Sequence, residues 1–289
     1  MLVSALTMDR IQIDETKSIG LLFQPRCGSH VVAHYLATQT NRGNLGELFN
    51  ARLSINFSTE VKLRQLIPTI IDGGKPFLDH ESDLVKREIL NLRVGLIESL
   101  IHSNRQEVFK IYPNSYLTFY PELSARLKQC KHVQYILLAR ADVLYSMISA
   151  VISSTSDTFH NFNAKRVTHD VNNLVIPREL ITIAVNNYIM QADHIAKYFG
   201  EVPVVYYEQF QDNVQNLRKI FSGIPAEIIS IPYNKFSGNH KSLIQNLDEV
   251  EYWFNEIVMN HQEYFPQYFG KLPHIKIPAR QGNQPSCVQ

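Results

Sequence analysis

The chain of 289 residues lacks several features that would assign it to a class directly. Its three cysteines are an odd number at wide spacing, which excludes a disulfide framework and a CxxC metal site. A reducing compartment, the cytoplasm, is therefore expected. No apolar run approaches the roughly 18 residues of a membrane-spanning helix. The first ten residues have neither the basic start nor the apolar core of a signal peptide, so none is expected.

The chain also lacks an excess of positive or negative residues. The 28 Lys and Arg residues almost balance the 27 Asp and Glu residues, for a net charge of +1, so nucleic acid is not expected as a partner. Hydrophobic residues make up 45% of the chain and charged residues 19%, which is typical of a globular protein. We expect one domain over residues 1–289, with a polar lead-in at 1–17 and an irregular tail at 265–289. A homodimer remains open.

Apolar runs typical of buried strands alternate with segments of helical periodicity. The strands are expected at 19–23, 107–112, 133–139 and 202–207, and the main helices at 31–36, 82–103, 115–129, 142–153, 178–199, 210–222 and 242–260. Residues 40–50, rich in Asn and Gly, predict a loop. This alternation predicts a three-layer α/β fold resembling P-loop NTPases, with a central parallel sheet of about four to five strands flanked by helices.

The stretch 18–36 organises the chain, because it predicts a strand, a tight turn and a helix in direct succession. Free N–H groups at a helix N-terminus favour an anion. Arg26 adds a guanidinium suited to phosphate or sulfate oxygens, Ser29 adds a hydroxyl, and Gly28 permits close backbone approach. The turn has neither the first Gly nor the Lys of a Walker A motif. The alternative is an ordinary strand–helix turn whose arginine meets solvent.

A second arginine, Arg140, ends the strand predicted at 133–139, and Asp142 is a plausible N-cap for the following helix. Ligands of parallel sheets bind at the carboxyl ends of the strands. Arg26 and Arg140 are both expected at that edge. No His, Cys, Asp or Glu cluster has the spacing of metal ligands, so no metal is expected.

Four segments match a family pattern in order and spacing. They are Pro25-Arg26-Cys27-Gly28-Ser29-His30 and the segments 136–149, 204–224 and 235–250. Together they resemble the sulfotransferases that use 3′-phosphoadenosine 5′-phosphosulfate (PAPS), with spacing closest to the bacterial carbohydrate sulfotransferase branch. The resemblance implies that residues 25–30 wrap the 5′-phosphosulfate of the donor. Cys27 and His30 stand where the family has hydroxyl side chains.

The same resemblance assigns the other end of the donor. It implies that Arg140 binds the 3′-phosphate together with a serine. Ser149 fits the spacing of the bacterial branch, and Ser146 fits that of the cytosolic enzymes. It further implies that Lys241 or Lys235 reaches a phosphate from a basic loop.

The resemblance also implies a role for the segment that contains Glu208. This residue is expected to tie the strand–helix junction that follows residue 206, without taking part in the chemistry.

For the chemistry, the resemblance implies sulfuryl transfer to a hydroxyl of a carbohydrate or small alcohol. Glu47, in a Glu-Leu-Phe setting, is the expected general base, Arg26 stabilises the leaving phosphate, and Lys110 contacts the sulfate or the acceptor. Histidines are alternative bases because an unperturbed imidazole titrates near neutral pH: His30, His34 and His80. A stacking wall for the acceptor is a further hypothesis: Tyr112, Tyr116, Phe119, Phe159 and Phe162.

Two other functions remain open. A kinase-like phosphotransferase would need the Walker lysine and a magnesium site, and the loop lacks that lysine. A non-catalytic nucleotide- or glycan-binding relative would keep the fold and lose turnover, which the departures at Cys27 and His30 favour.

Overall fold

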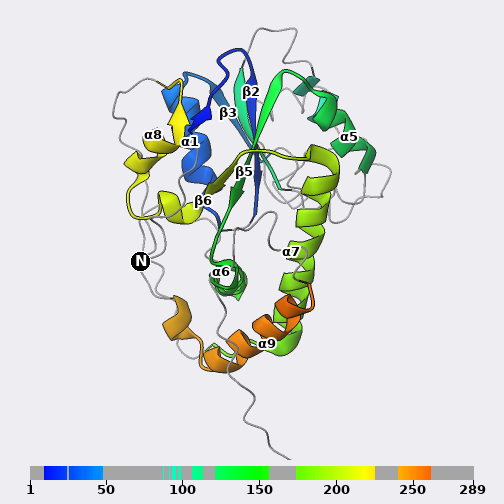
Figure 1. Ribbon diagram of the computed structural model, residues 1–289, viewed down its shortest axis with the longest axis vertical. Coiled ribbons are helices and arrows are strands. Elements are labelled where there is room, and N and C mark those ends of the chain that lie inside the picture. Colours follow the sequence, from blue (N-terminus) through cyan, green and yellow to red (C-terminus); the bar gives the residue numbers. More distant parts are fainter. Residues whose placement is uncertain are drawn as a thin grey trace, which may run out of the picture.

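A computed structural model describes most of the predicted elements. The described residues are 10–24, 26–47, 106–112, 121–155, 174–224 and 240–261, with the helical positions 87, 91, 93–95 and 97–98. Five parallel strands form the central sheet in the order β3-β4-β2-β5-β6 (Figure 1). Their bounds are Ser18–Phe23 (β2), Gly43–Glu47 (β3), Glu107–Ile111 (β4), Val133–Ala139 (β5) and Val204–Tyr206 (β6). The predicted α/β class with a parallel sheet is confirmed.

Helices cover both faces of the sheet, which is why its central strands are apolar on both sides. All six residues of β2 and all five of β4 are buried. On one face α1 (Ser29–Gln39) and α8 (Leu217–Ile220) pack against the sheet. On the other face lie α5 (Pro121–Gln129), the helical residues Val94 and Ile97 and the C-terminal part of α7 (Arg178–Phe199). The result is the predicted three-layer arrangement.

A third apolar cluster lies beyond the carboxyl edge of the sheet. There α6 (Val143–Thr155) and α9 (Leu247–Met259) pack with the first half of α7. Figure 1 shows α6 below the end of β5 and α9 at the bottom of the molecule. The short η6 (His240–Leu243) packs against α6. Helix α6 therefore begins directly at the edge where parallel sheets bind ligands.

Several predicted boundaries were wrong. The expected loop at 40–50 contains β3, which pairs with β4 through a register shift between Asn44 and Gly46. Pairing with β4 overrides the low strand propensity of this segment. Gly43 also leaves room for the carboxylate of Glu107, which would clash with a Cβ atom at position 43. The lead-in contains β1 (Ile11–Gln12), paired in parallel with β7 (Phe221–Ser222).

Two helices are shorter than expected. The segment 210–222 forms η5 (Val214–Asn216), α8 and β7 instead of one helix, and the helix expected from 242 begins at Leu247, after η6. The helix at 178–199 has its predicted bounds and ends at Gly200, whose φ is 68°. The remaining short element is η4 (Tyr207–Gln209). The irregular tail expected at 265–289 lies outside the described residues.

The strand order places a topological switch point between β2 and β5. From β2 the chain continues to β3 and β4 on one side, and from β5 it continues to β6 on the other. Ligands of open parallel sheets bind in the crevice outside such a point. Arg26 and Arg140 follow the two strands that flank it.

Candidate functional site

The loop between β2 and α1 has an unusual backbone. Arg26 has a φ of 65° and Gly28, the N-cap of α1, a φ of 74°. A Cβ atom on Gly28 would lie 3.0 Å from ring atoms of both Phe210 and Tyr207. Glycine is therefore required at 28 by its dihedral angle and by the close approach of two rings. A positive φ at an arginine costs energy and is concentrated at functional sites.

The N-terminus of α1 opens at this loop. The carbonyl of Gly28 accepts from the N–H groups of Val31 and Val32, and no side chain caps the helix. The first N–H groups of a helix point out of its N-terminus, and the helix dipole adds positive potential there. The loop therefore has the electrostatics of an anion site.

Arg26, Arg140 and Ser149, here called the arginine cluster, come together from three parts of the chain. Arg140 Nη1 donates to the backbone oxygen of Arg26 at 3.2 Å, and Arg26 Nε donates to Ser149 Oγ at 3.1 Å. Ser149 lies on α6 and is 2% exposed. The structure thus joins the loop after β2, the end of β5 and the second turn of α6.

Two aromatic rings and a carboxylate hold Arg140 in place. Its guanidinium carbon lies 4.3 Å from the ring centroid of Tyr145 and 4.5 Å from that of Tyr207. Its Nε lies 3.5 Å from Glu208 Oε1, an ion pair that does not reach hydrogen-bond geometry. Among the described residues this buried Nε has no hydrogen-bond partner. Arg140 is therefore rigid and retains a donor for a ligand.

Glu208 lies on η4 and binds the start of α6, and not the strand–helix junction after residue 206 for which it was predicted. Its carboxylate accepts from the N–H of Ala141 at 2.9 Å and from the N–H of Asp142 at 3.2 Å. Asp142 in turn accepts from the N–H of Tyr145 at 2.8 Å and caps α6, as expected. These bonds satisfy N–H groups at the start of α6 and fix the position of Arg140.

Lys110, Glu47 and His30, here called the lysine cluster, lie on the neighbouring strands β3 and β4 and at the start of α1. Glu47 is the register partner of Lys110, and Lys110 Nζ donates to Glu47 Oε1 at 2.8 Å. Lys110 Nζ lies 3.0 Å from each ring nitrogen of His30, and His30 Nε2 lies 3.5 Å from Glu47 Oε1. The side chains of Lys110 and Glu47 are 1% and 7% exposed, whereas that of His30 is 43% exposed.

Burial lowers the pKa of the Lys110 ammonium, and the charge of Glu47 and its hydrogen bond oppose that shift. A carboxylate oxygen can accept a proton, and the exposed imidazole of His30 lies 3.5 Å from that of Glu47. The cluster therefore has the groups required for proton transfer.

The remaining predicted site residues occupy different surroundings. Cys27 is buried, and burial raises the pKa of its thiol to about 12, so it is not a nucleophile near neutral pH. Ser29 is the first residue of α1, and Ser146 is buried on α6. Lys241 on η6 donates to Glu251 of α9 at 3.1 Å. The suggested residues His80, Tyr116, Phe119, Phe159, Phe162 and Lys235 lie outside the described residues.

Sequence reasoning missed the side chains that surround the two clusters. The rings of Tyr145 and Tyr207 both contact the Arg140 guanidinium. Their closeness in sequence to Asp142 and Glu208 was the one available signal for these contacts. Gln24 is a second omission. It follows the apolar strand β2 and is 1% exposed, and a polar residue at the end of such a strand was an available signal.

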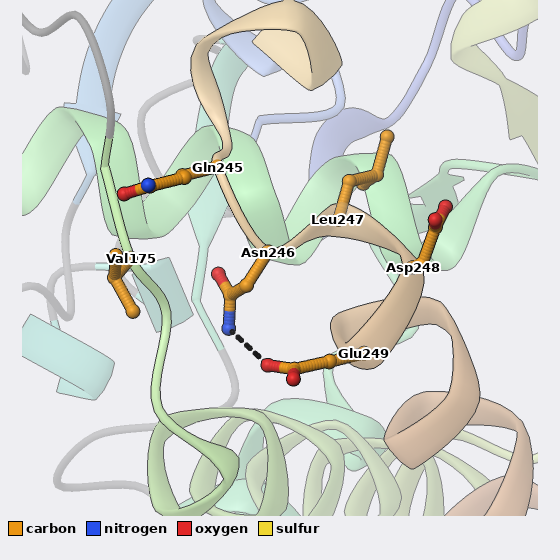
Figure 2. Close-up of a pocket in the computed structure, with 6 residues that line it drawn as sticks. All are labelled: Val175, Gln245, Asn246, Leu247, Asp248 and Glu249. Carbon is orange, nitrogen blue, oxygen red and sulfur yellow. Dashed lines mark hydrogen bonds between the residues drawn. The ribbon is translucent and has the colours of Figure 1, made fainter.

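A surface pocket of about 520 Å³ lies elsewhere, between residue 175 and the start of α9 (Figure 2). Asn246 closes one side, where its side chain bonds to the backbone N–H and oxygen of Ile176 at 3.0 and 2.9 Å. Asp248 and Glu249 line the pocket. Because carboxylates repel an anion and no predicted site residue lines it, this pocket is not the candidate site.

Comparisons add no assignment. No family model matches the chain, and no curated protein sequence matches it. Within the described part of the chain no three His, Cys, Asp or Glu residues are grouped as metal ligands. In that same part, no helix is both long and apolar enough to cross a membrane.

Proposed function

We propose that the protein transfers a sulfuryl group from PAPS to a hydroxyl of a carbohydrate or small alcohol. The observation that supports this most is the arginine cluster. Two guanidinium groups and a serine hydroxyl converge outside the switch point of a parallel sheet, beside the open N-terminus of α1. That arrangement suits a ligand with separated anionic groups. The sequence resemblance supports the choice of PAPS.

In this proposal the two arginines have different partners. Arg26 and the N–H groups of residues 27–29 hold the 5′-phosphosulfate. Arg140 and Ser149 hold the 3′-phosphate, with Ser146 as the alternative serine and Lys241 as a further phosphate contact. The contact between Arg26 and Ser149 joins the two halves of the proposed donor site.

The transfer resembles phosphoryl transfer, in which positioning and charge stabilisation provide most of the catalysis. The acceptor oxygen forms a bond to sulfur as the bond from sulfur to the bridging phosphate oxygen breaks. Adenosine 3′,5′-bisphosphate leaves with the electron pair of that bond, and Arg26 stabilises its new charge. The proton of the acceptor hydroxyl passes to a base. No step requires a metal.

Glu47 is the proposed base, and Lys110 holds its carboxylate in place. His30, at 3.5 Å from Glu47, is the alternative base or the route by which the proton reaches solvent. Transfer of labelled sulfate from PAPS distinguishes them. Glu47→Gln abolishes transfer if Glu47 is the base. His30→Asn then leaves measurable transfer with a changed pH profile.

The deciding experiment is calorimetric titration of the full chain with adenosine 3′,5′-bisphosphate, with ATP–Mg²⁺ as the control. We expect micromolar binding of the bisphosphate and no binding of ATP–Mg²⁺. The reverse result favours a kinase-like phosphotransferase. Binding of the bisphosphate without sulfate transfer to any acceptor favours the non-catalytic relative, and failure to bind either nucleotide contradicts the proposal.

A further inference from the structure

The end of β2 carries a buried amide that the proposed donor site does not use. Gln24 is 1% exposed, and neither its Nε2 nor its Oε1 has a hydrogen-bond partner among the described residues. Buried amides in native proteins are normally paired, because leaving them unpaired is costly. An unpaired amide at the functional edge of a sheet therefore points to a partner outside the chain.

A second amide faces the same region from α7. Gln191 is 2% exposed, and its Oε1 also has no partner among the described residues. Tyr188 lies one turn earlier on the same face of α7. Burial raises the pKa of the Tyr188 phenol, and the neighbouring amide of Gln24 opposes that rise. Tyr188 therefore lies near Gln24, although no contact of the Gln24 amide reaches hydrogen-bond geometry.

This polar region continues to the lysine cluster through aromatic side chains. Gln191 Nε2 lies 3.5 Å from the hydroxyl oxygen of Tyr112, a long hydrogen bond. The ring of Tyr112 stacks on Phe23, with centroids 5.5 Å apart. Lys110 Nζ lies 5.5 Å from the centroid of that Phe23 ring. A row of side chains in contact thus leads from the Gln191 amide to the lysine cluster.

The chemistry of these groups selects the type of molecule. Each amide both donates and accepts, and neither has a net charge. A ligand with several neutral hydroxyl groups satisfies them and the Tyr112 hydroxyl together. An aliphatic alcohol would leave the buried amides unpaired, and sites of this kind reject such analogues strongly. A carboxylated acceptor would bring a charge that the two amides cannot neutralise.

We propose that Gln24, Gln191 and Tyr112 bind the non-reacting hydroxyl groups of a neutral saccharide acceptor. This inference rests on the proposed function, because it places the acceptor's reacting hydroxyl at the lysine cluster. It also narrows that function, since it selects a neutral saccharide over a small aliphatic alcohol or an acidic sugar.

Saturation-transfer NMR on the full chain tests the inference. The probes are a panel of neutral mono-, di- and trisaccharides, with octan-1-ol and glucuronic acid for comparison, all in the presence of adenosine 3′,5′-bisphosphate. We expect saturation transfer to at least one neutral saccharide and none to the two comparison compounds. Gln24→Met and Gln191→Met should each weaken saccharide binding about tenfold, the effect of one lost neutral hydrogen bond.

Controls separate binding from folding. Gln39→Met changes another buried glutamine, at the far end of α1, and should leave saccharide binding unchanged. Melting temperatures identify any variant that fails to fold. If a glutamine variant fails, Tyr112→Phe, which removes only a hydroxyl, is tested in its place. Methionine at 24 should keep or raise the melting temperature, because it removes a buried amide of which neither atom is paired.

The outcomes are distinct. No binding of any neutral saccharide, or unchanged binding in folded Gln24→Met and Gln191→Met, overturns the inference. In the second case the amides bind ordered water only. Calorimetry with adenosine 3′,5′-bisphosphate is read separately. Absence of bisphosphate binding contradicts the proposed function. Normal bisphosphate binding without saccharide binding contradicts the acceptor site alone.

Discussion

Two cationic clusters lie at the same edge of the sheet, and they differ in how their charges are balanced. Lys110 is 1% exposed and bonds directly to the buried carboxylate of Glu47 at 2.8 Å. Arg140 is also buried, but tyrosine rings hold its guanidinium, and its carboxylate neighbour lies 3.5 Å from Nε. The first cluster is neutralised within the protein, and the second keeps positive charge for a ligand. The difference favours proton transfer at one and anion binding at the other.

Removal of the lysine tests the neutralised cluster and has the largest expected effect. Lys110→Met leaves the Glu47 carboxylate buried without its cation, which should lower the free energy of unfolding by about 3–5 kcal/mol. Urea denaturation measures this. The double variant Lys110→Met/Glu47→Met should recover most of the stability and none of the sulfate transfer. A loss below about 1 kcal/mol in the single variant would show that the pair is not buried as described.

Outside the two clusters, His194 is expected to make the stability of the protein depend on pH. Its Nε2 lies 2.8 Å from Ser124 Oγ at the contact of α5 and α7. Burial, with a smaller effect of Lys197, lowers the pKa of His194 to about 4. The unfolded chain, with a pKa near 6.5, binds more protons between these values, so stability falls as the pH drops from about 6.5 towards 4.

The expected contribution of His194 to that loss is about 3 kcal/mol at most. Urea denaturation at pH 7 and pH 4.5 measures it in the parent protein and in His194→Gln. The variant should lose less stability between the two pH values. Equal losses in both proteins would show that another group sets the acid sensitivity.

The ligand-directed cluster is tested through affinity. Arg140→Ala should weaken binding of adenosine 3′,5′-bisphosphate by about 1.5–3 kcal/mol, the effect of a lost charged hydrogen bond, or roughly 10- to 150-fold. Calorimetry measures it. Arg178→Ala is the matched control, because Arg178 forms an exposed ion pair with Glu256 and should change affinity less than twofold. Unchanged affinity in Arg140→Ala would remove Arg140 from the donor site.

The substitution with the smallest expected effect alters the loop of the arginine cluster without removing a charge. Gly28→Ala adds a Cβ at a φ of 74° and 3.0 Å from two rings, so it should lower stability by about 1–3 kcal/mol and weaken bisphosphate binding. Gly95→Ala is the control. Gly95 is helical with open space around it, so alanine should raise stability by about 0.5–1 kcal/mol. Equal effects of the two substitutions would contradict the loop geometry.

The sequence predicted the strongly apolar elements and the edge at which the arginines meet. The strand at 133–139 and the helix at 178–199 have their predicted bounds, because burial and helical periodicity determine them locally. The strand β3 was not predicted, since its Gly-Asn-Leu-Gly-Glu sequence has little strand propensity and forms only by pairing with β4. Local patterns contain no information on such long-range pairing.

The same limit applies to the candidate site. Arg26 and Arg140 were nominated from strand ends and Ser149 from the family resemblance, and the three do meet. The tyrosines around Arg140 could not be nominated, because ring-to-guanidinium contacts depend on side-chain rotamers and on packing between segments far apart in the chain. The buried amides of Gln24 and Gln191 were missed for a related reason, since burial of a polar side chain follows from the tertiary packing around it.

The parallel sheet has a consequence for folding kinetics. Its central strand β2 pairs with β4 and β5, and the bond between Arg26 and Ser149 joins residues 123 positions apart. Contacts of such sequence separation form slowly, because long loops must close before any pairing compensates for the lost entropy. The arginine cluster therefore forms late, after the chain through α6 has been placed. In refolding, recovery of bisphosphate binding should lag behind recovery of helical circular dichroism, and chains truncated before α6 should not bind.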